Sequence, residues 1–199
     1  MVDQLSLGAW APPLRADLGQ FHTPVKLAQK MVAWAGVRNG DAVLEPSAGG
    51  GNIVRELQKV GARVTAVEID LPWAQVLRSE FPTVSVHECD FLRMGVFDHD
   101  AALMNPPLSG GVGPSHVAHA LSMVPLVVSV LRLSDLVGDE HCRVLWDPYE
   151  LTRLALLRHR PLFTGDGGKT DFCVVEVGHR DTGRPRQYTI EHWMERWDG

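Results

Sequence analysis

Two spacings of apolar residues alternate along the chain. Short runs in which apolar residues are consecutive or alternate with polar ones are typical of strands, whereas apolar residues three and four positions apart are typical of a helix that packs on one face. Seven segments have the strand pattern: 41–46, 63–70, 83–90, 100–105, 125–133, 151–159 and 171–177. Five have the helical pattern: 23–36, 52–61, 71–81, 115–124 and 133–146.

The order of these segments predicts an α/β fold. Strands that alternate with helices of about ten residues imply βαβ units, whose strands run parallel. We therefore expect one Rossmann-like domain over residues 19–178, with a mostly parallel seven-stranded sheet and helices on both faces. Residues 1–18 are expected to form an irregular arm. Residues 179–199 form a polar tail that is compatible with a small appended helix, and whether its Trp193 and Trp197 cap the domain or meet a partner stays open.

Cysteine usage and the absence of long apolar segments indicate where the chain works. The three cysteines have no paired spacing, which favours reduced thiols in a cytoplasmic protein. The first ten residues lack the basic start and apolar core of a signal peptide. The longest apolar stretch, residues 121–131, is interrupted by polar residues and a proline, so we expect no membrane association. His116 and His119 share a helical face, but no further ligand has supporting spacing, and we expect no metal.

The charge of the chain bears on nucleic-acid binding. A formal net charge of −5 counts against strong unaided binding to a duplex, because proteins that bind duplexes usually have a basic face. Basic residues nevertheless gather late in the chain: Arg153, Arg158, His159, Arg160, Arg180, Arg184 and Arg186. Such a group is compatible with a local nucleic-acid-binding patch and with an ordinary solvated face.

A glycine loop separates the first predicted strand from the helix that follows. Residues 44–52 are Leu-Glu-Pro-Ser-Ala-Gly-Gly-Gly-Asn. Glycines let the backbone turn sharply and approach a ligand, and the start of the next helix offers free N–H groups. The second predicted strand ends with Glu68, whose carboxylate can accept hydrogen bonds from both hydroxyls of a ribose. No lysine follows the glycines, so the two features together favour a nucleoside-containing cofactor over a phosphate loop or a plain turn.

Asn105-Pro106-Pro107-Leu108 ends the fourth predicted strand, at the sheet edge that faces the ligand crevice of open α/β folds. Residues 105–108 resemble a signature of enzymes that methylate planar amino groups, and an exocyclic amine conjugated to a ring is a poor nucleophile, because its lone pair is delocalised. The side-chain oxygen of Asn105 and the carbonyl of Pro106 can accept both of its N–H protons. This pair of acceptors would orient the nitrogen and stabilise the positive charge that develops on it, and the two prolines stiffen the loop.

These segments resemble the motifs of class I S-adenosylmethionine-dependent methyltransferases. Residues 43–52 (VLEPSAGGGN) resemble the first cofactor motif, and residues 105–108 resemble the [DNS]-PP-[YFW] signature of enzymes that methylate planar amines. The resemblance implies that Glu45 and the glycines hold the methionine end of S-adenosylmethionine, Glu68 its ribose and the Asp90-Phe91 pair its adenine. The cofactor-binding set that it implies is Phe21, Thr23, Pro24, Glu45, Pro46, Ser47, Ala48, Gly49, Gly51, Asn52, Glu68, Ile69, Asp90, Phe91 and Asn105.

A finer resemblance is to small phage and prophage enzymes that methylate adenine N6 in DNA. Residues 19–24 are similar to their G-x-[YF]-x-T-P element, which closes over the cofactor, and residues 131–134 and 160–171 are similar to their LLRL and RPxFTGxGKTD segments. This resemblance implies DNA methylation, with the catalytic residues Asn105, Pro106, Pro107 and Leu108. It places the target base against Leu108, Phe163, Thr164 and Lys169.

Leu108 departs from this family, which normally has an aromatic residue there to stack the target base, a contact worth roughly 1–3 kcal/mol. In addition, the interval between Gly51 and Asn105 leaves no room for a target-recognition domain. The acceptor therefore stays open. We favour a DNA substrate over RNA, with RNA adenine or a protein glutamine amide as the alternative and a non-catalytic binding module as a third possibility. Sequence selectivity would come from the loops or from a specificity partner.

Overall fold

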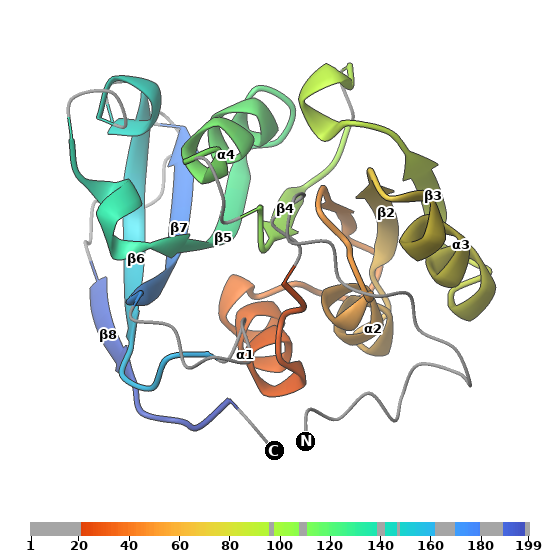
Figure 1. Cartoon of the computed structure of the whole chain (residues 1–199), viewed down its shortest axis with the longest axis horizontal. Coiled ribbons are helices and arrows are strands. Elements are labelled where there is room, and N and C mark those ends of the chain that lie inside the picture. The colour runs from red at the N-terminus through yellow and green to blue at the C-terminus, as the bar shows by residue number, and fades with distance from the viewer. Residues whose placement is uncertain are drawn as a thin grey trace.

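The computed structural model describes residues 21–95, 98–107, 111–138, 142–146, 148–161, 170–179 and 189–197. These residues form one sheet with helices on both faces (Figure 1). The elements in chain order are α1 (Val25–Ala35), β1 (Ala42–Glu45), α2 (Asn52–Lys59), β2 (Arg63–Glu68), α3 (Leu71–Glu80), β3 (Ser85–Glu88), β4 (Ala101–Met104), α4 (Gly113–Leu121), β5 (Leu126–Arg132), β6 (Tyr149–Leu157), β7 (Phe172–His179) and β8 (Thr189–Trp193). No helix in these parts of the chain is long and apolar enough to cross a membrane.

The sheet has the strand order β3-β2-β1-β4-β5-β7-β6-β8. β7 runs antiparallel to both of its neighbours, and every other pair of neighbouring strands is parallel. The prediction of a mostly parallel α/β sheet is therefore confirmed. Strands β2 and β3 are added on one side of β1, whereas β4 and the later strands lie on its other side. The strand order therefore reverses between β1 and β4. In open α/β sheets, ligands bind at such a reversal, outside the carboxyl ends of the strands.

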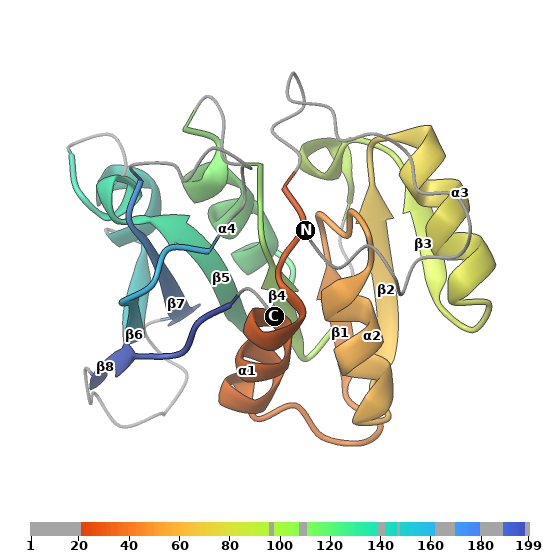
Figure 2. The ribbon, with the colours of Figure 1, turned by 60° about the horizontal axis from the view of Figure 1, so that its bottom comes forward.

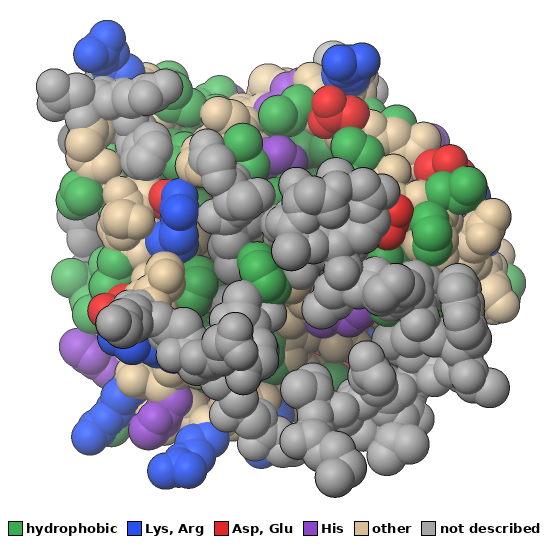
Figure 3. Space-filling model, in the orientation of Figure 1, with side chains coloured by type: hydrophobic (Ala, Val, Ile, Leu, Met, Phe, Trp, Pro, Cys, Tyr) green, Lys and Arg blue, Asp and Glu red, His purple; other side chains and the backbone are tan. Residues whose placement is uncertain are grey.

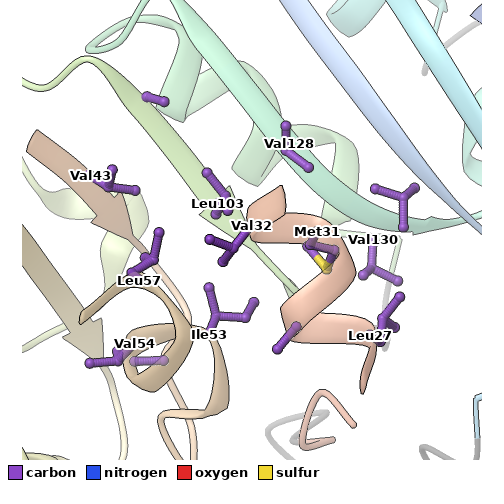
Figure 4. Close-up of a cluster of buried hydrophobic side chains, with 14 of the residues drawn as sticks. Leu27, Met31, Val32, Val43, Ile53, Val54, Leu57, Leu103, Val128 and Val130 are labelled. Atoms are coloured by element: carbon purple, nitrogen blue, oxygen red, sulfur yellow. The ribbon is translucent and has the colours of Figure 1, made fainter. Parts of the chain in front are cut away.

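Two apolar cores cover the two faces of the sheet. Helices α1 and α2 lie side by side over β1 and β4 (Figure 2), and in this core Met31 and Leu57 pack near Val43, Leu103 and Val128 (Figure 4). The other face is covered by α4, whose buried residues pack with alternate residues of the same strands. Because both faces are covered, the central strands β1, β4 and β5 are buried along almost their whole length and consist mostly of apolar residues.

The tail contributes an eighth strand in place of the small helix that its sequence was compatible with. Strand β8 pairs in parallel with β6, and the side chains of Trp193 and Trp197 are each only 2% exposed. Glu191 of β8 accepts hydrogen bonds from the indoles of Trp34 and Trp193, and the guanidinium of Arg153 stacks 4.0 Å from the Trp34 ring centroid. The tryptophans therefore cap the domain, because burying their rings against α1 fixes the tail as a strand.

The predicted helix over residues 133–146 is wrong as a single element. Its described part contains two short turns, a 3-10 turn at Leu133–Leu136 and a π turn at Cys142–Trp146. Gly138 between them has a φ of 101°, a left-handed conformation that a helix cannot continue through.

Candidate active site

The carboxyl ends of β1 to β4 open onto a cavity of about 170 Å³. It lies at the reversal of strand order, and segments far apart in the sequence meet around it. The residues that line it are Phe21, His22, Pro46, Ser47, Gly49, Glu68, Ile69, Cys89, Asp90, Phe91, Asn105, Pro107 and His116. Most of the predicted cofactor-binding residues are thus brought together. The remaining ones are not among the lining residues: Thr23, Pro24, Glu45, Ala48, Gly51 and Asn52.

The glycine loop has the backbone that its sequence suggests. Gly49 and Gly51 have φ values of 50° and 75°, in the left-handed region that side chains disfavour. Gly51 is also the residue that precedes α2, and a Cβ there would lie 2.5 Å from Phe81 Cε2. A Cβ at Gly50 would lie 2.7 Å from the ring of His22. Both the turn and the close packing on its two sides therefore require glycine.

Glu68 ties this loop to the end of β2. Its Oε2 accepts a hydrogen bond from the Gly49 amide at 2.7 Å, and its Oε1 accepts one from the Asp70 amide at 2.9 Å. Burial raises the pKa of Glu68, and the negative charge of Asp70 raises it further, against the opposing effect of the backbone hydrogen bonds. The Glu68 carboxyl group thus borders the cavity in a fixed orientation, and its contact with a ribose stays a prediction.

Glu45, at the end of β1, is 1% exposed and directly precedes Pro46, which lines the cavity. Burial raises its pKa well above the usual value, with a smaller contribution from the charge of Glu68, and a hydrogen bond from the Val54 backbone opposes the rise. Its Oε2 has no hydrogen-bond partner among the described residues. Glu45 is thus a second carboxyl group near the cavity whose burial favours the protonated form.

The segment of residues 21–24, which we call the strap, crosses the cavity ahead of α1. Asn105 Nδ2 donates to the Phe21 carbonyl at 3.0 Å, and Asn52 Nδ2 donates to the Thr23 carbonyl at 2.8 Å. Between them, the His22 ring packs edge-on against Trp73 with centroids 4.4 Å apart. Burial lowers the pKa of His22 to about 4, so this wall of the cavity is uncharged at neutral pH.

Asn105 is 7% exposed and follows β4 directly. Because its nitrogen is committed to Phe21, the side-chain oxygen is left as the acceptor, and no described residue bonds it. Pro107 lines the cavity beside it. The structure thus provides one of the two acceptors that the sequence predicts for an amine substrate. The predicted substrate contacts Leu108, Phe163, Thr164 and Lys169 lie outside the described residues.

The far end of the cavity is built by the turn after β3. Asp90 accepts a hydrogen bond from the Leu92 amide at 3.0 Å, which begins the 3-10 turn Phe91–Arg93. The Phe91 ring is buried against two histidines of α4, with centroids 5.7 Å from His116 and 4.8 Å from His119. An apolar ring thus lies beside a carboxylate at the cavity, and the adenine contact that the family resemblance implies for this pair stays a prediction.

Sequence reasoning missed three residues of the lining. His22 lies within the predicted closing element and Cys89 directly precedes Asp90, so their positions beside motifs were available as signals. His116 had none, because only the packing of α4 brings it to the cavity. Its Nδ1 lies 3.0 Å from the Val112 carbonyl and burial lowers its pKa, which favours a neutral ring. Within the described segments, no three His, Cys, Asp or Glu side chains are placed to hold a metal ion.

Known proteins resemble the chain at two levels. No protein-family model matches the sequence. A segment of 84 residues is 42% identical to ribosomal RNA small subunit methyltransferase A of Thermotoga petrophila. The matched segment covers 40% of this chain and 32% of that protein. The match thus spans about a third of the length of such curated relatives.

The structural likeness extends over most of the chain. A proposed RNA methyltransferase from Pyrococcus horikoshii superposes with a TM-score of 0.70 at 19% identity, over 88% of this chain and 96% of that one. A dimethyladenosine transferase from Plasmodium falciparum superposes with a TM-score of 0.64 at 16% identity, over 80% of this chain and 63% of that one. A magnesium protoporphyrin IX methyltransferase from Synechocystis, solved with S-adenosylmethionine bound, superposes with a TM-score of 0.63 at 14% identity, over 78% of this chain and 79% of that one. The chain therefore has the fold of the class I S-adenosylmethionine-dependent methyltransferases, and it shares part of its sequence with proteins named as ribosomal RNA methyltransferases.

Proposed function

We propose that this chain binds S-adenosylmethionine and methylates an exocyclic amine of a nucleobase, with adenine in RNA as the acceptor. The observation that carries the proposal is the Asn105 oxygen, a buried acceptor without a partner among the described residues, at a cavity that the glycine loop also lines. Relatives named as ribosomal RNA methyltransferases support RNA as the acceptor. S-adenosylmethionine, when bound, supplies the methyl group.

The residues around the cavity fit this cofactor. Glu68 offers a carboxylate to the ribose hydroxyls, and the ring of Phe91 offers an apolar surface to the adenine. Glu45 is a buried carboxyl group whose ionised form a bound cation would favour, and the neutral ring of His22 adds no positive charge that would oppose a sulfonium. Asn105 and the Pro106 carbonyl accept the N–H protons of the target amine. They hold its lone pair toward the reacting carbon and stabilise the charge that develops on nitrogen, which then loses its proton to water.

An unpaired adenine suits this surface better than one inside a duplex. The net charge is −5, and on the face shown in Figure 3 the described Lys and Arg side chains lie in several separate places. Strong duplex binding needs a basic face, and reaching a base inside a duplex costs a few kcal/mol of unstacking that an unpaired base spares. DNA adenine remains the second candidate, and the similarity of residues 19–24 and 160–171 to phage enzymes supports it.

The acceptor is identified by incubating the purified chain with methyl-labelled S-adenosylmethionine and separate pools of ribosomal RNA, single-stranded DNA, duplex DNA and cell protein. We expect label in RNA, recovered as methylated adenosine, and none with the Asn105→Ala variant. Label confined to DNA would replace RNA by the second candidate. Calorimetric binding of the cofactor without label in any pool would leave a binding module and contradict the proposed activity.

The buried glutamates should make the chain sensitive to pH. Because burial raises the pKa of Glu45 above the usual 4.5, the folded chain holds this proton more tightly than the unfolded one. The resulting stability is fully present below the unfolded pKa and is lost as the pH rises through the folded pKa. A cationic ligand favours the carboxylate, so affinity for the cofactor should rise over that same window.

Thermal unfolding and calorimetric titration across a pH series test this expectation. Glu45→Gln should flatten the pH dependence of both the unfolding temperature and the cofactor affinity, because the amide does not titrate. Glu150→Gln makes the same chemical change at a residue outside the cavity lining and should keep both profiles. Profiles for Glu45→Gln that match the wild type would mean that this carboxyl group does not respond to the cofactor.

A further inference from the structure

Two asparagines from different parts of the fold hold the strap by its backbone. Asn52 belongs to the first turn of α2 and donates to the Thr23 carbonyl at 2.8 Å. Asn105 follows β4 and donates to the Phe21 carbonyl at 3.0 Å. The two carbonyls are separated only by His22, whose ring is packed against Trp73. The strap is therefore a short, fixed connection between the start of α2 and the residue expected to hold the substrate amine.

The orientation of the Asn52 amide is itself determined by an ion pair. Arg55 Nη1 donates to Asn52 Oδ1 at 3.1 Å, while Arg55 Nη2 lies 2.7 Å from Glu80 Oε2 at the end of α3. The guanidinium also lies 5.2 Å from the centroid of Phe81. The side chains of Arg55 and Glu80 are 23% and 20% exposed, so this planar group is held on several sides. If the Asn52 amide were flipped, its NH2 group would face the N–H donor of Arg55. The orientation that avoids this clash of donors directs the Asn52 nitrogen at the Thr23 carbonyl.

We propose that Asn52 is a positioning residue for Asn105, acting through the strap and without touching the substrate. The inference rests on the proposed function, because it assigns Asn105 Oδ1 as the acceptor for the target amine. The Asn105 oxygen is left as the acceptor without a described partner while the nitrogen is bonded to the Phe21 carbonyl. If the strap shifts, the amide loses that partner and can turn its N–H groups toward the substrate, where they oppose the N–H protons. Asn52 prevents this by anchoring the carbonyl two residues away.

Asn52→Asp isolates the step, because aspartate still accepts from Arg55 but has no proton to donate to Thr23. Asn39→Asp is the matched control, with the same chemical change at an exposed turn before β1. We expect kcat of Asn52→Asp to fall about tenfold to a hundredfold, since small misplacements of reacting groups remove productive geometry. KM for the nucleic acid should stay unchanged, and Asn39→Asp should match the wild type. An increase in KM for the nucleic acid with an unchanged kcat would overturn the proposal.

A double-mutant cycle tests whether Asn52 acts through Asn105. In single-turnover assays, Asn52→Asp should slow the wild type but have no further effect in an Asn105→Ala background. Equal slowing in both backgrounds would mean that Asn52 acts independently, which contradicts the proposal. Thermal unfolding of each variant checks the fold, and Asn52→Ser, which removes the amide without adding charge, replaces Asn52→Asp if that variant unfolds.

A spectroscopic readout does not depend on activity. The side-chain amide resonances of Asn105 in a ¹⁵N spectrum are identified by their loss in Asn105→Ala. They should shift in Asn52→Asp and stay in place in Asn39→Asp. Unmoved resonances in Asn52→Asp would overturn the positioning role. Absence of methyl transfer in the wild type, with the expected shift present, would instead count against the proposed function alone.

Discussion

Asn105→Ala is expected to lose methyl transfer by a factor of about 10² to 10³ in kcat, the usual cost of removing one acceptor or donor that stabilises charge in a transition state. The side chain is buried beside the cavity, and its oxygen has no partner among the described residues. Alanine leaves the amine without this acceptor. Cofactor affinity should weaken only slightly, because the variant also frees the Phe21 carbonyl of the strap.

Single-turnover rates and calorimetric cofactor titrations separate these two effects. Asn105→Asp is the informative companion, because it keeps an acceptor oxygen but has no proton for Phe21. We expect its rate to lie between those of the wild type and Asn105→Ala. An alanine variant as fast as the wild type would remove Asn105 from the reaction and leave the cavity as a binding site only.

Gly51→Ala is expected to lower the free energy of unfolding by about 2–5 kcal/mol, the sum of the cost of a left-handed alanine and of overpacking. Gly51 has a φ of 75°, and a Cβ there would lie 2.5 Å from Phe81 Cε2 and 2.8 Å from Leu77 Cδ2. Relief of that contact must displace either α3 or the loop. Cofactor binding should therefore be lost together with stability.

Gly36→Ala is the control for the clash, because Gly36 has a similar φ of 67° and nothing within 4 Å of its built Cβ. Denaturant unfolding should show a smaller loss for it, about 1–2 kcal/mol from backbone strain alone. Equal losses in the two variants would mean that the contact of Gly51 with α3 carries no cost and that strain explains both.

The local features of the site could be anticipated because each depends on a short stretch of chain and on one general rule. The glycine loop follows one predicted strand, Glu68 and Asn105 lie near the ends of two others, and parallel strands end at the same edge of a sheet. Their meeting around one cavity therefore follows from the order of the elements. The resemblance to methyltransferase motifs added the cofactor and the class of reaction, which no spacing of apolar residues contains.

Contacts between distant segments could not be anticipated in the same way. The hydrogen bond from Asn105 to Phe21 spans 84 positions of the sequence, and the one from Asn52 to Thr23 spans 29. No local pattern encodes either. Asn52 looks like a cofactor contact in the sequence because it follows the glycines, yet its side chain is engaged by Thr23 and Arg55.

The alternation of strands and helices, the position of the glycine loop and the residues at the ends of the central strands could all be predicted from the sequence. Hydrophobic periodicity and glycine conformation act over a few residues, so they can be read locally. That the tail adds strand β8 depends on tertiary packing, because burial of Trp193 and Trp197 outweighs the local preference of a polar segment. The tertiary structure also decided which histidines reach the cavity and how the strap orients Asn105, since these depend on packing between elements that are distant along the chain.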